Sequence, residues 1–350
     1  MTNSDTIPVR PEEAFDKSRL EAYLKGQLEG SDNSLAVRQF GGGKANLTYL
    51  LDYGEREYVL RRPPLGPVPP TAHDMAREYK VLSVLHENFS YAPRALHFCG
   101  DQEIIGAPFF IMDRKVGVVI RKTLPENFEK MANGPQLISA QLINVLAEFH
   151  QVDYSALGLD DLGKPEGFLQ RQVKGWKNRW DKAKHEDLPA VENIFNWLSE
   201  NIPETKNYSI IHNDYKLDNV MYNTNDPGKL IAVFDWDMCT LGDSLCDLGS
   251  LLSYWCTTSD PVFFQKAASM PIDDRFYSRV QLVQQYAEMT GFDVSNIRFY
   301  HVLGLYRLIG IAAQIYIRFL RGQTQDKRFA IFGDMINLVS EYGEELISDA

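Results

Sequence analysis

IIHNDYKLDNVMYN, residues 210–223, is the stretch that decides the fold expected for this chain. It carries a histidine, two aspartates, a lysine and several asparagines between apolar residues of the kind found in buried strands. Asp214 and Asn219 stand five residues apart, and Asp235 follows four apolar residues in IAVFDWD, residues 231–237. A buried carboxylate destabilises a protein unless it is paired or bound to a metal. The pattern therefore indicates functional groups rather than solvent-exposed side chains.

Phosphoryl transfer needs the groups that these two stretches supply. One carboxylate orients or deprotonates the attacking hydroxyl, while oxygen ligands hold the Mg²⁺ ions that bridge the phosphates of ATP. The spacing matches the kinase catalytic-loop pattern, which is followed by a metal-binding Asp at a strand end. We therefore expect Asp214 to be the catalytic carboxylate, with Asn219 and Asp235 at the metal site. Lys216, two residues after Asp214, could neutralise the transferring phosphate.

The upstream half of the chain has a second set of candidate groups. FGGGKANLTYLL, residues 40–51, is typical of a Gly-rich turn between two strands, where backbone N–H groups can approach phosphates. Arg61 ends the next strand as a cation, and Glu78 on the following helix is positioned to pair with it. Each feature has an ordinary explanation too, because many hairpin turns contain glycines and such charged side chains are usually solvated. The order of the groups along the chain favours a kinase-type site.

The composition is that of a soluble globular protein. The 350 residues allow about two domains or one bilobal unit. Lys and Arg number 36 and Asp and Glu number 47, which gives a formal net charge of −11. An acidic chain repels a phosphate backbone at long range, so no nucleic-acid partner is expected, although local basic groups can still hold a small anion.

The cysteines and the apolar segments indicate the cellular compartment to expect. None of the four cysteines forms a CxxC pair, so reduced, cytosolic thiols are expected. The N-terminal residues have no apolar segment of the secretory kind. The most apolar long window, residues 302–320, is interrupted by Arg307, Gln314 and Arg318, so a buried core helix is expected there and not a membrane span. A cytoplasmic protein with no membrane partner is predicted, and the oligomeric state is left open.

Hydrophobic periodicity predicts a small antiparallel sheet with helices, followed by a mostly helical part. Helical spacing occurs in residues 11–28 and 73–88, and strands are indicated as a three-stranded meander in 35–62 with two more in 97–112. Beyond residue 135 the pattern is helical at 137–153, 168–183 and 275–348, with strand-like pieces at 208–211 and 230–235. The predicted division is residues 1–112, an ATP phosphate-binding sheet, and residues 113–350, a helical part with the catalytic loop and the acceptor site.

A family resemblance extends over about residues 12–345. HNDYKLDNVMYN together with IAVFDWDMCTLGDSLCDLGSLL resembles the aminoglycoside phosphotransferase, or choline kinase-like, family. YSALGLDDLGKPEGFLQRQVKGW and GLYRLIGIAAQIYIRFLRG are similar to the branch related to kinase-like domains fused to some acyl-CoA dehydrogenases. The resemblance implies an α+β, protein kinase-like bilobal fold, in which an N-lobe antiparallel sheet with helices and a mostly helical C-lobe bind ATP and Mg²⁺.

The resemblance also implies a role for each matching position. Asp214 would be the catalytic base, and Asn219 and Asp235 the metal ligands. Arg61 would take the place of the usual lysine at the α- and β-phosphates, supported by Glu78. The remaining implied positions are the phosphate cover at Gly41, Gly42, Gly43 and Lys44, the adenine hinge from Met112 to Arg114, and the structural carboxylates Asp243 and Asp247.

Several positions depart from related kinases. Asn213 stands where the family usually has glycine, and DWD stands where protein kinases have DFG. Arginine at position 61 is not equivalent to lysine in phosphate geometry. No A-P-E element occurs, which argues against a protein kinase and favours a small-molecule acceptor. His212 is expected to orient the loop by hydrogen bonding rather than to act as a base.

The expected function is an ATP-dependent phosphotransferase that moves the γ-phosphate to a small-molecule hydroxyl. Resemblance to the dehydrogenase-linked branch suggests a hydroxyacyl-CoA or a hydroxy acid as the acceptor. Such an anion could be steered by Gln170 and the basic row Arg171, Lys174, Lys177 and Arg179, although a solvated basic face is the ordinary explanation. The alternatives are a catalytically silent nucleotide-binding pseudokinase and an aminoglycoside or amino-alcohol kinase.

Overall fold

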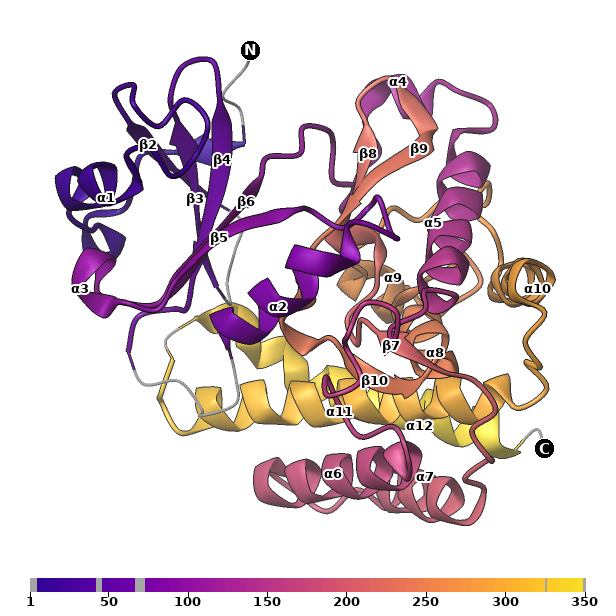
Figure 1. Cartoon of the computed structure of the whole chain (residues 1–350). Helices are drawn as coiled ribbons and strands as arrows, with labels where there is room; N and C mark the ends of the chain where they lie inside the picture. The colour runs from indigo at the N-terminus through magenta and orange to yellow at the C-terminus, as the bar shows by residue number, and fades with distance from the viewer. Residues whose placement is uncertain (1–4, 42–45, 67–72, 325, 349–350) are drawn as a thin grey trace. The chain divides into compact units, whose positions relative to one another are not determined.

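The computed structural model describes residues 5–41, 46–66, 73–324 and 326–348 (Figure 1). Its contacts divide the chain into two compact units. The first unit consists of Met1–Gly117 and Ile231–Met238, and the second of Val118–Leu230 and Cys239–Ala350. The segment Ile231–Met238 thus belongs to the first unit, although it lies within the predicted range 113–350.

The first unit is built on a six-stranded antiparallel sheet in the order β1-β2-β3-β4-β6-β5. The predicted meander is confirmed by consecutive pairing of β2 (Ala36–Phe40), β3 (Leu47–Asp52) and β4 (Glu57–Arg62). The two strands predicted in 97–112 are β5 (Ala95–Cys99) and β6 (Phe109–Asp113), joined by the short helix α3 (Gln102–Ile105). A two-residue strand that was not predicted, β1 (Thr6–Ile7), pairs with β2.

Aspartate side chains cap the α-helices of the first unit, with Asp101 as the N-cap of α3. Asp16 accepts a hydrogen bond from the backbone N–H of Arg19 and begins α1 (Lys17–Leu24). This helix is shorter than the predicted 11–28, because Pro11–Glu13 forms a separate 3₁₀ turn and Gly26 takes a positive φ of 73°. Asp74 caps α2 (Met75–Leu85) through the N–H groups of two residues. One core cluster joins α1, through its Leu20 and Leu24, to apolar side chains of β3, β4 and β6.

The second unit is mostly helical, and its central element is α11 (Ile297–Leu320) (Figure 1). This helix packs against four others, namely α6 (Phe168–Ala183), α7 (Pro189–Glu200), α8 (Leu245–Tyr254) and α12 (Phe332–Ser348). A Cβ on Gly249 of α8 would lie 2.3 Å from the backbone of Tyr300, so only glycine permits this approach. By length and composition α11 could cross a membrane, but 56% of its most apolar window is buried within the protein. The packing supports the predicted core helix.

The second unit contains further helices among the described residues. They are α4 (Glu126–Glu129), α5 (Gly134–His150), α9 (Val262–Ala267) and α10 (Arg279–Thr290). The predicted helix at 168–183 is confirmed with the same bounds, and α5 begins before the predicted 137–153. Spacing along α6 places its large apolar residues on a buried face, as predicted: Leu169, Val173, Trp176 and Trp180.

Two pairs of short strands frame the polar stretch. β7 (Tyr208–Ile211) pairs with β10 (Thr240–Asp243), and β8 (Val220–Asn223) pairs with β9 (Asp226–Val233). The strands expected at 208–211 and 230–235 are present as β7 and β9, whereas β8 and β10 were not predicted. Residues 212–219 form the connection between β7 and β8 and include the 3₁₀ turn η2 (Leu217–Asn219).

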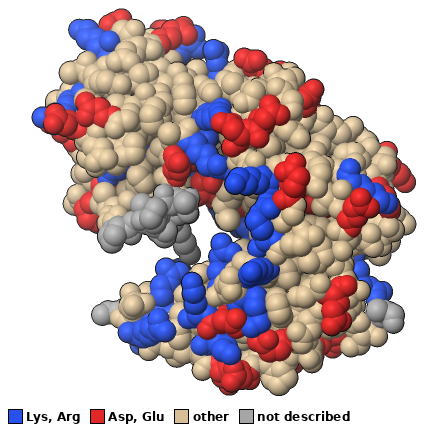
Figure 2. Space-filling view, turned by 60° about the horizontal axis from the view of Figure 1, so that its bottom comes forward, with Lys and Arg blue, Asp and Glu red and all other residues tan. Residues whose placement is uncertain are grey.

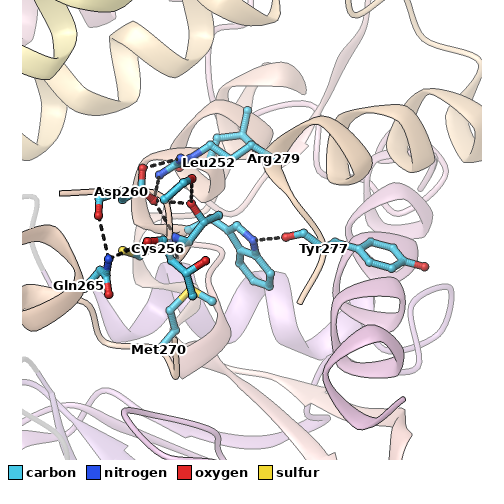
Figure 3. A network of polar contacts seen from close by, with 11 residues as sticks. Leu252, Cys256, Asp260, Gln265, Met270, Tyr277 and Arg279 are labelled. Atoms are coloured by element: carbon cyan, nitrogen blue, oxygen red, sulfur yellow. Dashed lines mark hydrogen bonds and ion pairs between the residues drawn. The ribbon is translucent and has the colours of Figure 1, made fainter. Parts of the chain in front are cut away.

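A polar network fixes the irregular segment that follows α8 (Figure 3). Arg279 donates to both carboxylate oxygens of Asp260, each at 2.9 Å, and to the carbonyl of Leu252 at 3.1 Å. The backbone N–H of Thr257 donates to Asp260 at 2.6 Å, and the indole N–H of Trp255 donates to the carbonyl of Tyr277. Burial opposes the ionised form of Asp260, but hydrogen bonds from Arg279 and Thr257 lower its pKa below the usual value.

Replacing Asp260 with alanine should lower the free energy of unfolding by about 2 kcal/mol, because it leaves Arg279 without its bidentate partner. Urea denaturation followed by tryptophan fluorescence measures this change. Glu126→Ala is the matched control, since its ion pair with Lys130 is exposed to solvent. Equal effects of the two substitutions would contradict a stabilising role for the network.

Candidate functional site

Six of the predicted site residues form two groups, one in each unit. Asp214, Lys216 and Asn219 belong to the catalytic loop, here defined as residues 212–219 of the second unit. Strand residues that flank this loop, Ile210, Ile211 and Val220, are fully buried. The polar loop thus emerges from a rigid apolar base, as the alternation of residues in the sequence indicates.

A buried carboxylate, that of Asp247 in the first turn of α8, holds the start of the catalytic loop. It accepts hydrogen bonds from the backbone N–H groups of His212, at 2.6 Å, and Asn213, at 2.7 Å. Nε2 of His150 lies 3.2 Å from the same carboxylate, and Nδ1 of His150 lies 2.7 Å from the hydroxyl of Tyr286. Burial opposes ionisation, but His150 and His212 lower the pKa of Asp247. The second structural carboxylate, Asp243, accepts from Tyr300 at 2.7 Å.

The residue after the histidine occupies left-handed backbone space. Asn213 has a φ of 63°, a value that glycine adopts freely and that asparagine tolerates better than most other residues. The family's usual glycine and the asparagine of this chain are therefore compatible with the same loop conformation. Both backbone contacts to Asp247 form with Asn213 in place.

Three side chains of the catalytic loop converge on one another. Nζ of Lys216 lies 3.0 Å from the Asp214 carboxylate, and Nδ2 of Asn219 donates to Oδ2 of Asp214 at 2.7 Å. The Asn219 amide also donates to the backbone carbonyl of Asp214. Nδ1 of His212 accepts from the backbone N–H of Asp214 at 3.2 Å, which is the orienting contact expected of this histidine. Asp214 is therefore fixed between a cation and an amide.

Lys216 remains charged in this environment. Its Nζ lies 4.9 Å from the ring centroid of Tyr254, a cation–π contact. Burial opposes the charge, but Tyr254, Asp214 and Asp218 raise the pKa of Lys216 above its usual value. The adjacent Asp218 has a buried Oδ1 without a hydrogen-bond partner among the described residues, and burial raises the pKa of its carboxyl.

The other group, in the first unit, is centred on Arg61. β4 is an inner strand, so Arg61 lies between Thr48 of β3 and Phe110 of β6 and is 9% exposed. Its guanidinium donates to Glu78 at 3.0 Å and to Asp235 at 2.5 Å. Because Glu78 is only 2% exposed, the ordinary explanation of solvated charges does not hold for this pair. The ion pair expected from the sequence is present and buried.

Negative charge exceeds positive charge around Arg61. Burial raises the pKa of Glu78 to about 7, with Arg61 opposing the shift and Asp237 adding to it. Burial also opposes the charge of Arg61, but the carboxylates of Glu78 and Asp235 raise its pKa. Asp235 follows β9 with a φ of 70°. One guanidinium thus faces several carboxyl groups, an arrangement that favours an additional cation.

The remaining predicted nucleotide-binding residues have varied surroundings. Gly41 is exposed after β2, whereas Gly42, Gly43 and Lys44 lie outside the described residues. Met112 is buried in β6, opposite Val59. The guanidinium of Arg114 pairs with Glu57 at 2.6 Å and lies 3.4 Å from Asp5. Among residues 5–41, 46–66, 73–324 and 326–348, no group of three or more His, Cys, Asp or Glu could hold a metal ion.

Sequence reasoning did not identify three contributors to these groups. His150 and Tyr254 lie outside the stretches that suggested the site, so only packing reveals their contacts with Asp247 and Lys216. Asp237 was visible as the second aspartate of DWD. Its Oδ2 lies 3.5 Å from Nδ2 of Asn46 and 3.7 Å from Nδ1 of His73.

Comparison with known proteins places these residues in a family. Residues 36–276 match the model of the phosphotransferase enzyme family, a range that includes Arg61, Glu78, the catalytic loop and Asp235. The chain belongs to the phosphotransferase enzyme family. This family and the acyl-CoA dehydrogenase link were both expected from the sequence. Acyl-CoA dehydrogenase family member 11 of Pongo abelii is 32% identical over 98% of this chain. The chain spans 44% of the length of that protein.

Solved structures show the fold. A candidate aminoglycoside phosphotransferase from Ralstonia eutropha matches with a TM-score of 0.82 and 28% identity, over 96% of this chain and 99% of that one. Choline kinase from Cryptosporidium parvum matches with a TM-score of 0.65 and 10% identity, over 95% and 96% of the two chains. The predicted α+β, kinase-like fold of this phosphotransferase-family member is confirmed.

Asn213→Gly should leave the free energy of unfolding within about 0.5 kcal/mol of the wild type, whereas Asn213→Val should lower it by about 1–2 kcal/mol. The reason is the φ of 63°, which a β-branched residue adopts only under strain. Urea denaturation of both variants measures the difference. If valine were tolerated as well as glycine, the left-handed conformation would not constrain the loop.

Proposed function

We propose that this member of the family is an ATP-dependent phosphotransferase that moves the γ-phosphate to a hydroxyl of a small molecule. The observation that carries the proposal is the carboxylate of Asp214, held between Lys216 and Asn219 on a loop that the buried Asp247 anchors. A carboxylate so fixed can orient an acceptor hydroxyl and take its proton.

Asp214 and Lys216 have complementary roles in this proposal. Asp214 binds the acceptor hydroxyl and holds its proton as the oxygen becomes a nucleophile. Lys216 keeps its charge, and its flexible side chain can exchange the contact with Asp214 for an oxygen of the transferred phosphate. Most of the rate enhancement would then come from positioning and charge, with no covalent enzyme intermediate.

The groups around Arg61 would bind the phosphates of ATP. Arg61 is held rigidly by Glu78, so its remaining N–H groups can be directed at the α- and β-phosphates. The Gly-rich segment Gly41, Gly42, Gly43 and Lys44 would cover the phosphates, and the backbone from Met112 to Arg114 would read adenine. These roles follow from the family resemblance.

The donor atoms fit Mg²⁺, which prefers carboxylate and amide oxygens. The amide nitrogen of Asn219 is bound to Asp214, and among the described residues its amide oxygen receives no hydrogen bond. Asp235 belongs to the group around Arg61, where negative charge predominates. By the family resemblance, Asn219 and Asp235 would each supply an oxygen ligand to the metal. When bound, the ion neutralises the charge of the β- and γ-phosphates.

The acceptor class is proposed from the relatives. Because relatives such as acyl-CoA dehydrogenase family member 11 are more than twice as long as this chain, their full activity is not transferred to it. Their name supports a hydroxyacyl-CoA or a hydroxy acid as the acceptor. A pseudokinase remains the alternative, and Arg61 in place of lysine is the feature that favours it. A cytoplasmic location is likewise a proposal, based on the four free cysteines.

Asp214→Asn should lower kcat by about 10²–10⁴-fold and leave Mg-ATP binding intact, because an amide cannot accept the hydroxyl proton. ADP release is measured over a panel of hydroxyacyl-CoAs, hydroxy acids, amino alcohols and aminoglycosides. Asp226→Asn, at the exposed first residue of β9, is the matched control. ATP binding with no release above the Asp214→Asn background for any acceptor would favour the pseudokinase.

Asp235→Asn should abolish the Mg²⁺-dependent part of nucleotide affinity, since it removes an anionic oxygen from the proposed metal site. Calorimetric titration with ATP, in Mg²⁺ and in EDTA, separates this part from direct phosphate binding. The same Asp226→Asn variant serves as the control. Unchanged Mg-ATP affinity would remove Asp235 from the metal site.

A further inference from the structure

A small cavity in the second unit lies beside the catalytic loop. It has a volume of about 20 Å³, and one of its walls is Asn213, the immediate neighbour of Asp214. That volume is enough for the end of one polar group. The other walls come from α6, α8 and α11 and include Gln172, Trp176, Ser250 and Arg307.

The lining of this cavity carries positive charge. Arg307 is the charged residue in the lining, and the described residues that line it include no Asp or Glu. Gln172 and Asn213 add amide groups, which can donate hydrogen bonds. A pocket for a polycation needs carboxylates to neutralise the ligand. This lining therefore suits an anion better than an aminoglycoside or an amino alcohol.

A second arginine lies beside the same wall. The guanidinium carbon of Arg179 lies 4.5 Å from the ring centroid of Trp176, and that of Arg307 lies 5.6 Å from it. Among the described residues Arg179 has no carboxylate partner, and burial together with the charge of Arg307 lowers its pKa. Two like charges at one indole repel each other, and a bound anion would relieve that repulsion.

Other Lys and Arg residues described near the cavity do not stack on Trp176. Lys and Arg side chains gather on the face of the second unit that carries α6 and the end of α11 (Figure 2). Lys177 is neutralised by Asp181 and Glu192, and Arg171 binds backbone carbonyls of Lys164 and Glu166. Of the basic row on α6, Arg179 is the member that stacks on the cavity wall.

We propose that the cavity at Trp176, with Arg307 and Arg179, binds an anionic group of the acceptor, so that the acceptor's hydroxyl is directed at Asp214. This deepens and rests on the proposed function. The substrate class is a hydroxyl compound that also carries a carboxylate or a phosphate. Arg307 is the residue that determines this specificity, and Arg179 supplies additional positive potential.

Anion binding can be tested without turnover. The probes are 3-hydroxybutanoate, its neutral amide 3-hydroxybutanamide, and inorganic phosphate, titrated calorimetrically into the full chain. The wild type should bind an anionic probe at least about tenfold more tightly than the amide, as expected for charge-assisted hydrogen bonds. Binding of only phosphate would assign the subsite to a phosphoryl group. Failure of both anions to bind better than the amide would overturn the proposal.

Substitutions locate the subsite. Arg307→Gln should lower the affinity for the anionic probe by about tenfold or more and leave the affinity for the amide unchanged. Arg307→Lys should restore part of the affinity for the anion. Arg179→Gln, at an exposed position, should also lower the affinity for the anionic probe, but by less. This variant tests the subsite if Arg307→Gln does not fold. Arg318→Gln, on the exposed end of α11, is the control. Equal loss in Arg318→Gln and Arg307→Gln would contradict a specific subsite.

The two proposals fail in different ways. Asp214→Asn should bind the anionic probe as the wild type does, because Asp214 acts on the hydroxyl. Suppose that anion binding depends on Arg307 but the protein releases no ADP with any acceptor. The subsite proposal would then stand, and the proposed catalytic function would be wrong. With turnover present, Arg307→Gln should raise KM for anionic acceptors and leave kcat nearly unchanged. A lowered kcat with unchanged KM would instead assign Arg307 to the chemical step.

Discussion

The hydrogen bonds between Asp247 and the backbone of residues 212 and 213 are the constraint on which the catalytic loop depends. A carboxylate with no solvent exposure is stable only if its charge is fully compensated, and here two N–H groups and His150 compensate it. Because Asp247 lies on α8, the position of the loop follows from the packing of that helix. The close approach of α8 and α11 at Gly249 thus contributes to the geometry around Asp214.

In the first unit, the buried charge of Arg61 also needs compensation. A guanidinium on an inner strand needs partners that come from elsewhere in the chain, and it finds Glu78 on α2 and Asp235 after β9. In the proposed function, rigid placement of Arg61 would compensate for the difference between arginine and the lysine found in related kinases, because a fixed planar donor can still meet phosphate oxygens. The excess of carboxyl groups around it would favour the divalent cation of the proposed function.

In the proposed function, charge at the cavity beside Asn213 would select the acceptor. Members of a phosphotransferase family can share a catalytic loop and differ in what they phosphorylate, since fold and chemistry do not fix the acceptor. In this chain the cavity lining joins Arg307 and two amides with no carboxylate among the described residues. This lining is the structural support for the proposed anionic acceptor.

The sequence by itself determined the kind of chemistry and the order of its groups. Asp214, Asn219 and Asp235 are recognisable because short loops fix local spacing, and the helix at 168–183 is recognisable because its period of apolar residues is local too. Only the tertiary structure decided that Arg61 and Glu78 are buried, that Asp247 anchors the loop, and that Arg179 and Arg307 share Trp176. Each of these contacts joins residues from different elements, and their partners are selected by packing, which no local pattern encodes.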